Sequence, residues 1–246
     1  MTGETNSASV QIERRLPWQI RAAMAVRPVV YIPLGTIEWH GEHLPVGLDA
    51  LTAHGVCAQA AVKAGGLVLP ALHYGTGGGH GAYPWTIMMQ DDSEISAQLG
   101  KTLSRLEDFG CKLAVLFSGH FADTQLTMID HVAGSWNGRQ GPMRVMATAV
   151  NRIEGLAIAP DHAGVFETTL LSALHPDLVQ LERLPPLHKV PLTTDDWADS
   201  RHDAKHPVWG VFGPDPRAFD PKQGPALLAA SVDWLIARVG AEFPHA

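Results

Sequence analysis

Four short apolar runs alternate with longer segments of helical character, and this alternation constrains the fold more than any other feature of the sequence. The runs cover residues 29–34, 67–72, 112–117 and 143–150, and within them apolar residues are continuous rather than alternating. Continuous apolar strands are typical of a parallel sheet that is buried on both faces. We therefore predict an α/β protein with three layers, α/β/α, around a mostly parallel central sheet.

The segments between and after these runs predict six helices, at residues 14–25, 50–64, 93–109, 123–134, 164–174 and 224–239. Asp123 is expected to be the N-cap of its helix. Residues 73–92 are glycine-rich and residues 176–223 are rich in Pro, Asp and His, so both segments are expected to be irregular. Residues 1–11 are expected to form a disordered tail, and residues 12–246 one domain.

Composition limits the classes of partner. The net charge of -7 argues against nucleic acid and anionic membranes as partners. No uncharged apolar stretch reaches the ~20 residues of a membrane span, and the polar start lacks the apolar segment of a signal peptide. We therefore expect a cytoplasmic protein in which Cys57 and Cys111 are core residues. Because only 17% of residues are charged, much of the surface is expected to be buried in a homo-oligomer.

A group of metal-ligand residue types follows the first apolar run. Residues 35–49 read GTIEWHGEHLPVGLD and contain five such residues: Glu38, His40, Glu42, His43 and Asp49. Glu38 and His40 are two positions apart, so on an extended chain they point the same way. Mixed oxygen and nitrogen ligands favour Zn²⁺, Mn²⁺ or Fe²⁺. The alternative is a solvated polar loop in which Glu42 or His43 pairs at the surface.

Further candidates follow the third and fourth apolar runs. His120 comes directly after one, and His162 and Glu167 come after the other. Ligands of parallel sheets lie beyond the carboxyl ends of the strands, so these side chains are expected to share one pocket. His162 and Glu167 are either ligands, or a proton shuttle and its orienting partner. The alternative for His120 is that it only caps a helix or packs in the core. The alternative for the other group is that Asp161 or Thr168 caps the helix while Glu167 faces water.

The glycine-rich loop does not fit a dinucleotide-binding fingerprint. Pro84 and Trp85 follow its last glycine, where the fingerprint requires a helix. We expect instead that its backbone approaches a substrate, with His80, Tyr83 or Trp85 as a wall; a plain flexible loop is the alternative. The sequence also lacks the Gly-x-Ser-x-Gly, Cys-x-x-Cys and His-Glu-x-x-His motifs, so serine hydrolases, zinc ribbons and zincins lose support.

Residues 33–49, PLGTIEWHGEHLPVGLD, resemble the signature of the creatininase family. The resemblance continues through 119–120, 162–168 and 210–216, and covers most of residues 29–235. It implies a three-layer α/β/α fold, a hexameric assembly and two divalent metal ions per subunit, Zn²⁺, Mn²⁺ or Fe²⁺. It also implies hydrolysis of C–N bonds in cyclic amides, formamides or a peptide precursor.

By position, the resemblance also implies roles for individual residues. Glu38 and His120 would bind one metal, His40 would bind the other, and Asp49 would bridge both. His162 would be the proton donor.

The chain departs from the family pattern at several positions. Creatininase has a metal-binding glutamate two residues after the second-motif histidine, where this chain has Ala122. We therefore expect Glu167 to supply the remaining ligand. The usual Asn-Gly-His-Gly-Gly-Asn is replaced by Ser-Gly-His-Phe-Ala-Asp, and Glu42 stands where proline is frequent. Creatinine itself is thus not the expected substrate. The residues expected to contact substrate are Trp39, His80, Tyr83, Trp85 and Phe121.

These residues predict a metal-dependent amidohydrolase. A hydroxide held between two metals would attack a carbonyl, and His162 would protonate the departing nitrogen. One rival is a metal-dependent hydrolase of a lactone or of an activated ring ketone in a sugar-like compound. The other is a non-catalytic binding protein that retains the fold, which Ala122 favours.

Overall fold

The computed structural model describes residues 10–88 and 90–243, with the backbone alone at His80. The predicted tail falls mainly on residues 1–9, which lie outside these ranges. At its end, Val10 is buried and Gln11 forms a parallel bridge with Val68. The strands are β1 (Val29–Leu34), β2 (Leu67–Val68), β3 (Leu113–Ser118) and β4 (Arg144–Ala149). The helices are α2 (Pro17–Val26), α3 (Leu48–Ala64), α4 (Asp92–Asp108), α5 (Asp123–Asn137), α6 (Val165–Leu174) and α7 (Gly224–Glu242).

All strands of the sheet are parallel, in the order β2-β1-β3-β4. Val29 pairs with Leu113, which pairs in turn with Arg144, so β1, β3 and β4 start at the same level. Their carboxyl ends therefore also lie together at one edge. This arrangement confirms the predicted parallel sheet.

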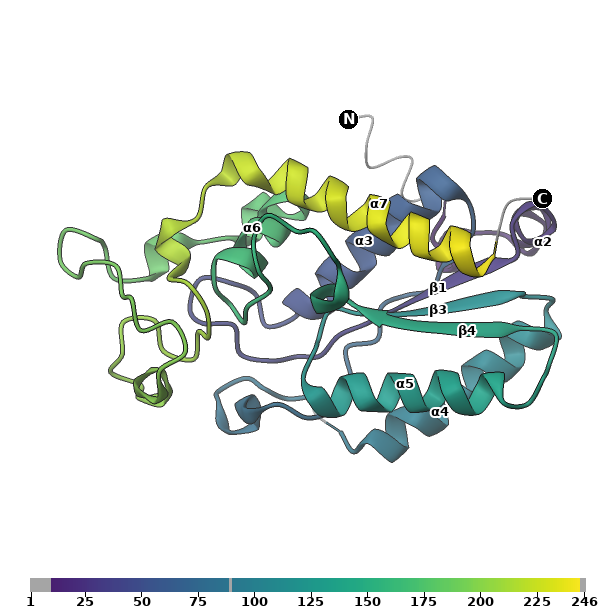
Figure 1. Cartoon of the computed structure of the whole chain (residues 1–246), viewed down its shortest axis with the longest axis horizontal. Helices are drawn as coiled ribbons and strands as arrows, with labels where there is room; N and C mark the ends of the chain where they lie inside the picture. Colours follow the sequence, from purple (N-terminus) through teal and green to yellow (C-terminus); the bar gives the residue numbers. More distant parts are fainter. Residues whose placement is uncertain (1–9, 89, 244–246) are drawn as a thin grey trace.

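Successive residues of each strand face opposite sides of the sheet, and each side is covered by helices (Figure 1). Tyr31 and Val115 pack into a core with α3, α6 and α7, whereas Ile32 and Leu116 pack into a core with α4 and α5. The protein thus has the predicted α/β/α layers. Cys57 and Cys111 are both buried and free, one in each core, as expected of core residues.

The second strand is shorter than predicted. Beyond Val68, the amides of Leu69 and Leu72 donate to the carbonyls of Tyr31 and Pro33. Pro70 lies between them and has no N–H to continue the ladder. Pro33, in the central strand β1, also lacks an N–H. Its carbonyl accepts from Leu72, so its nitrogen faces the β2 side of β1. The regular pairing with β2 ends at Tyr31 and Val68, and the missing N–H is therefore tolerated.

Four helix starts differ from the predictions, that of α2 by three residues, that of α3 by two and those of α4 and α6 by one each, and one helix cap differs as well. The start of α3 matters for function. Asp123 is the first residue of α5, and the N-cap is Ala122, so the expected cap was wrong. α3 starts at Leu48, two residues earlier than predicted, so Asp49 lies in the first turn of that helix. That turn adjoins the carboxyl edge of the sheet.

The irregular segment after α6 is held by two buried guanidinium groups. Arg201 has no exposed surface and donates to the carbonyls of Val211 (3.1 Å) and Gly213 (2.6 Å). Arg217 pairs with buried Asp215 at 2.6 Å. These contacts fix a segment that, as expected, contains only short 3₁₀ turns. Among the described residues, no helix combines the length and apolarity that a membrane span requires.

Candidate metal centre

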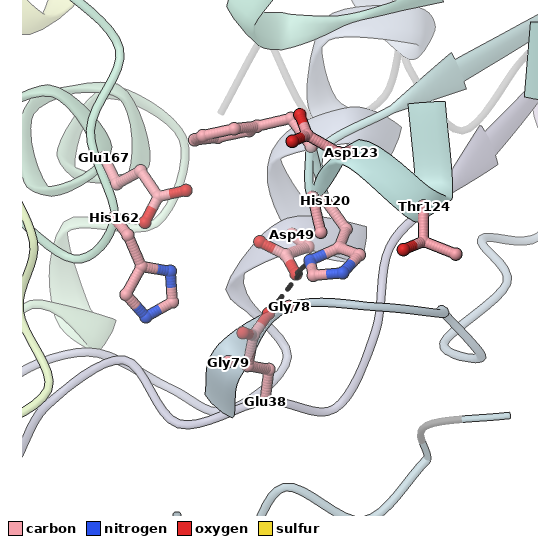
Figure 2. A pocket seen from close by; sticks show the side chains of 11 residues that line it. Glu38, Asp49, Gly78, Gly79, His120, Asp123, Thr124, His162 and Glu167 are labelled. Carbon is pink, nitrogen blue, oxygen red and sulfur yellow. Dashed lines mark ion pairs between the residues drawn. The ribbon is translucent and has the colours of Figure 1, made fainter. Parts of the chain in front are cut away.

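Four of the five predicted ligands line a pocket beyond the carboxyl ends of β1, β3 and β4 (Figure 2), and the fifth, His40, is buried against Asp49 and Glu167. The pocket has a volume of about 490 Å³, within the range of small-molecule sites. It is lined by Glu38, Asp49, Gly78, Gly79, His120, Phe121, Ala122, Asp123, Thr124, His162 and Glu167. Segments that are up to about 130 residues apart in the chain therefore contribute to one site, as the strand ends predicted.

Two glycines at the strand ends allow the first turn of α3 to enter this edge. A Cβ on Gly35 would collide with the backbone of Ala50, and one on Gly119 would collide with the backbone of Asp49. The glycine beside His120 is thus required for close approach of a helix. Its φ lies outside the left-handed region, so the close approach and not the backbone conformation requires glycine.

Three of the buried side chains form the first candidate ligand group: Glu38, Asp49 and His120. His120 Nδ1 lies 2.9 Å from Glu38 Oε2 and 3.3 Å from Asp49 Oδ2. Its other nitrogen, Nε2, lies 3.2 Å from the carbonyl oxygen of Thr76 and donates to it. A carbonyl accepts only, so Nε2 carries a proton, and Nδ1 is the nitrogen that faces the carboxylates.

The second candidate group contains His40, Asp49 and Glu167. His40 Nε2 lies 3.2 Å from Asp49 Oδ1 and 3.6 Å from Glu167 Oε2. Its Nδ1 donates to the carbonyl of Glu38 at 3.0 Å, which leaves Nε2 as the nitrogen that faces the carboxylates. Asp49 thus belongs to both groups, with one carboxylate oxygen directed to each histidine.

The donor set fits divalent cations. The other nitrogen of each ring donates to a backbone carbonyl, so Nε2 of His40 and Nδ1 of His120 are the nitrogens that face the carboxylate oxygens. Each of them would bind a cation once it has lost its own proton. Buried charges require a counter-charge, and nitrogen with oxygen ligands suits Zn²⁺, Mn²⁺ or Fe²⁺.

Electrostatics of the metal-free protein support the same interpretation. Burial alone would lower the pKa of His40, but the negative charges of Asp49 and Glu167 outweigh it and raise that pKa to about 10. Burial raises the pKa of Glu167 well above its usual value, although His40 opposes this. Burial would also raise the pKa of Asp49, but the two histidines lower it to about 2. Without metal, protons therefore supply the charge that cations would otherwise provide.

Glu167 is directed into the pocket by the turn that precedes α6. Its Oε2 accepts from the amide of Ala163 at 2.6 Å, and Ala163 has a left-handed φ of 57°. Asp161 accepts from three amides at the start of the helix, those of residues 164, 166 and 167. Asp161 thus caps α6, as one alternative held, but Glu167 is buried and does not face water.

His162 lines the pocket beside the second ligand group. Its ring lies 4.6 Å from that of His40, and its Nε2 lies 3.0 Å from the carbonyl oxygen of Trp39. Its backbone pairs with Phe212 in an antiparallel bridge. Glu38, His40 and His162 also have ligand atoms within 4.8 Å of one another. The geometry thus places His162 at the site, and its assignment as proton donor stays a prediction.

The predicted substrate-contacting residues lie in different places. Phe121 lines the pocket. Trp39 and Tyr83 are buried in an aromatic cluster with Trp209, at centroid distances of 5.0 Å and 5.4 Å from its ring. Trp85 is 69% exposed. None of these three lines the pocket, and the side chain of His80 lies outside the described part of the chain.

The two remaining ionisable residues of the first motif do not join the ligand groups. Glu42 is exposed. His43 is buried, and burial lowers its pKa to about 3, so it is neutral. Its Nε2 lies 3.3 Å from the hydroxyl of Thr168. His43 is thus a packed core histidine rather than the surface residue of the alternative.

One residue that supports the site was missed by sequence reasoning. Gln125 is fully buried, accepts from the amide of Thr76 at 3.1 Å and donates to the hydroxyl of Ser118 at 3.2 Å. It therefore fixes the loop whose carbonyl orients His120. A single buried polar residue in an amphipathic helix carries no signal of this role in the sequence.

Comparison with known proteins gives consistent matches. The family model described as "Creatininase: Creatinine amidohydrolase" matches residues 15–239. Creatinine amidohydrolase of Pseudomonas putida is 27% identical over 88% of this chain and 90% of its own length. The mycofactocin precursor peptide peptidase of Mycobacterium ulcerans is 28% identical over 86% of this chain and 84% of its own. A solved structure described as creatininase Mn, 26% identical, superposes with a TM-score of 0.74 over 96% of this chain and 99% of its own.

Proposed function

This chain belongs to the creatininase family, and from that premise we propose that it cleaves the C–N bond of a small cyclic amide, formamide or related substrate with two divalent cations. That it is a hydrolase of C–N bonds follows from the family and from its named relatives. The substrate and the residue roles are the proposed part.

The observation that carries the proposal is the position of Asp49 between two ligand groups. Its Oδ2 lies 3.3 Å from His120 and its Oδ1 lies 3.2 Å from His40. One carboxylate with an oxygen toward each group is suited to bridge two cations. Glu38 would complete one group and Glu167 the other.

A bound pair of divalent cations supplies a water of lowered pKa and polarises the carbonyl of the substrate. The chain's own residues supply the rest. Nε2 of His162 donates to the Trp39 carbonyl, so Nδ1 is the ring nitrogen that would hold and deliver the second proton. Delivery of that proton to the departing nitrogen is needed because an amide anion leaves poorly. Phe121 and the Gly78–Gly79 backbone border the remaining space, where the substrate would lie.

The test combines metal analysis with a substrate panel. The protein is stripped with chelator, reloaded with Mn²⁺ or Zn²⁺ and assayed on cyclic amides, formamides, lactones and short peptides. We expect about two ions per chain and metal-dependent release of amine from one of the amide classes. Faster turnover of lactones would favour the rival bond type. One ion or none, with no turnover, would favour a binding protein.

A peptide bond is the second candidate, because one relative is named as a peptidase of a peptide precursor. The pocket wall formed by Gly78, Gly79, Asp123 and Thr124 is exposed, which leaves room for a chain to extend from the site. The short peptides of the panel test this candidate directly.

We also propose that the chain forms a homo-oligomer. None of the ten residues of α2 is buried, although its sequence, PWQIRAAMAV, contains only one charged residue. Trp18, in α2, and Leu16, which precedes it, are strongly exposed. Apolar surface of this kind is typical of a subunit interface. Light scattering after size exclusion tests the proposal, and a monomer at micromolar concentration would contradict it.

A further inference from the structure

The pocket contains a carboxylate that neither ligand group uses. Asp123, the first residue of α5, lines the pocket beside Ala122 and Thr124. Unlike the ligands, it is exposed to solvent. No hydrogen bond or ion pair holds its carboxylate within the described ranges. Asp123 is therefore available to contact whatever enters the pocket.

Small residues separate Asp123 from the metal-ligand side. A Cβ on Gly78 would lie 3.6 Å from Cβ of Ala122, 3.7 Å from Oε1 of Glu38 and 3.7 Å from Cε1 of His120. Because Gly78 has no side chain and that of Ala122 is short, a strip of space beside these two residues stays free between the ligand groups and Asp123. In Figure 2, Asp123 and Thr124 border the pocket near His120, and His162 lies across it. A molecule bound at the ligand groups can thus extend along this strip toward Asp123.

The charges of the lining residues restrict what the molecule carries at that end. The lining includes four carboxylates and no lysine or arginine. The three ligand carboxylates together with one metal-held hydroxide would balance the charge of two divalent cations, which leaves the charge of Asp123 uncompensated. The amino end of α5 contributes roughly half a positive charge, so the full charge of the aspartate prevails. An ammonium, an amidinium or an amide N–H would pair with it, whereas a carboxylate would be repelled.

We propose that Asp123 is a specificity-determining residue that selects substrates with a cationic or N–H-donating group beside the cleaved bond. The inference rests on the proposed function, in which the carbonyl of the substrate is held at the ligand groups. It predicts a substrate with its acceptor end at the metals and its donor end at Asp123. Substrates with a carboxylate at that end are excluded.

The test uses a set of five-membered lactams that share one ring and carry, at the same carbon, an aminomethyl, a hydroxymethyl or a carboxylate group. Binding to the metal-loaded protein is measured by calorimetry near pH 7, and hydrolysis is measured separately. We expect the ammonium lactam to bind about tenfold tighter than the hydroxymethyl lactam, and the carboxylate lactam to bind weakest. In Asp123→Asn the first two affinities should agree within about twofold.

Asp92→Asn is the matched control. Asp92 is the exposed first residue of α4, as Asp123 is of α5, but it does not line the pocket. This control should keep the full preference. Tightest binding of the carboxylate lactam, no binding of any lactam, or a preference that survives Asp123→Asn would each overturn the proposal. Selective binding without hydrolysis would instead count against the proposed reaction while supporting the role of Asp123.

Discussion

Asp49→Asn is the most direct test of the metal centre, because it removes one negative charge and one acceptor atom while keeping the shape of the side chain. The two carboxylate oxygens lie 3.2 Å from His40 Nε2 and 3.3 Å from His120 Nδ1, so a cation in either group would lie within about 4 Å of this charge. At an effective dielectric of about 20, two unit charges at 4 Å interact by about 4 kcal/mol. Each cation should thus bind at least about a thousandfold more weakly.

The assay is metal content after dialysis against a weak chelator, followed by calorimetric titration with Mn²⁺ or Zn²⁺. The wild-type protein should retain about two ions per chain and the variant none. Glu42→Gln is the control, since Glu42 is an exposed acid in the same segment; it should retain both ions. Retention of two ions by Asp49→Asn, with affinities within about tenfold of wild type, would refute the bridging role.

Three further outcomes are expected. His162→Ala should keep both metals but lose at least about a hundredfold in turnover; loss of a metal would make His162 a ligand. Gln125→Leu should weaken one metal site about 10–100-fold, because the loop carbonyl that orients His120 is released, whereas unchanged affinity in a titration would exclude this support. With the pKa of metal-free His40 at about 10, metal binding at pH 7 should release protons, and affinity should rise about tenfold per pH unit for each proton, up to that pKa. Calorimetry in buffers of different ionisation enthalpy measures this release, and its absence would contradict the raised pKa.

The sheet could be predicted because its signal is local. All six residues of β1 are buried, and a continuous apolar run of that length between polar segments is typical of a parallel strand. The error in β2 was also local in origin, since Pro70 interrupts an apolar run that otherwise suits a strand. The start of α3 was missed because Leu48 and Asp49 lie at the end of a loop motif, where apolar periodicity has no weight.

The site was predictable only as far as topology determines it. Strand ends of a parallel sheet meet, so the convergence of Glu38, His120 and Glu167 followed from their positions in the chain. On an extended chain, side chains alternate between two sides, so if Glu38 and His40 point into the pocket, Trp39 between them points away from it. In the structure the Trp39 ring indeed packs against Trp209 and does not line the pocket.

Side-chain orientation beyond these rules depends on contacts that the sequence does not display. The hydrogen bond from the amide of Thr76 to Gln125 spans 49 positions, and that from His120 to Thr76 spans 44. Neither Thr76 nor Gln125 stands out in the sequence by its residue type or its spacing. The tautomers of His40 and His120, which decide whether these rings bind a metal, are set by backbone carbonyls whose positions exist only in the folded chain.

The same backbone contacts bear on whether the metals are needed for folding. In small metal-dependent domains the ligands are ordered only by the ion, and removal of the ion unfolds the chain. Here His40 and His120 each donate to a backbone carbonyl, and Glu167 accepts a backbone amide. Two apolar cores lie on the two faces of the sheet, and a third, which contains Leu48 and Ala163, packs beside the ligand residues. The metal-free protein should therefore stay folded with its ligands in place, their charge balanced by protons, and bind metal by exchanging those protons for cations.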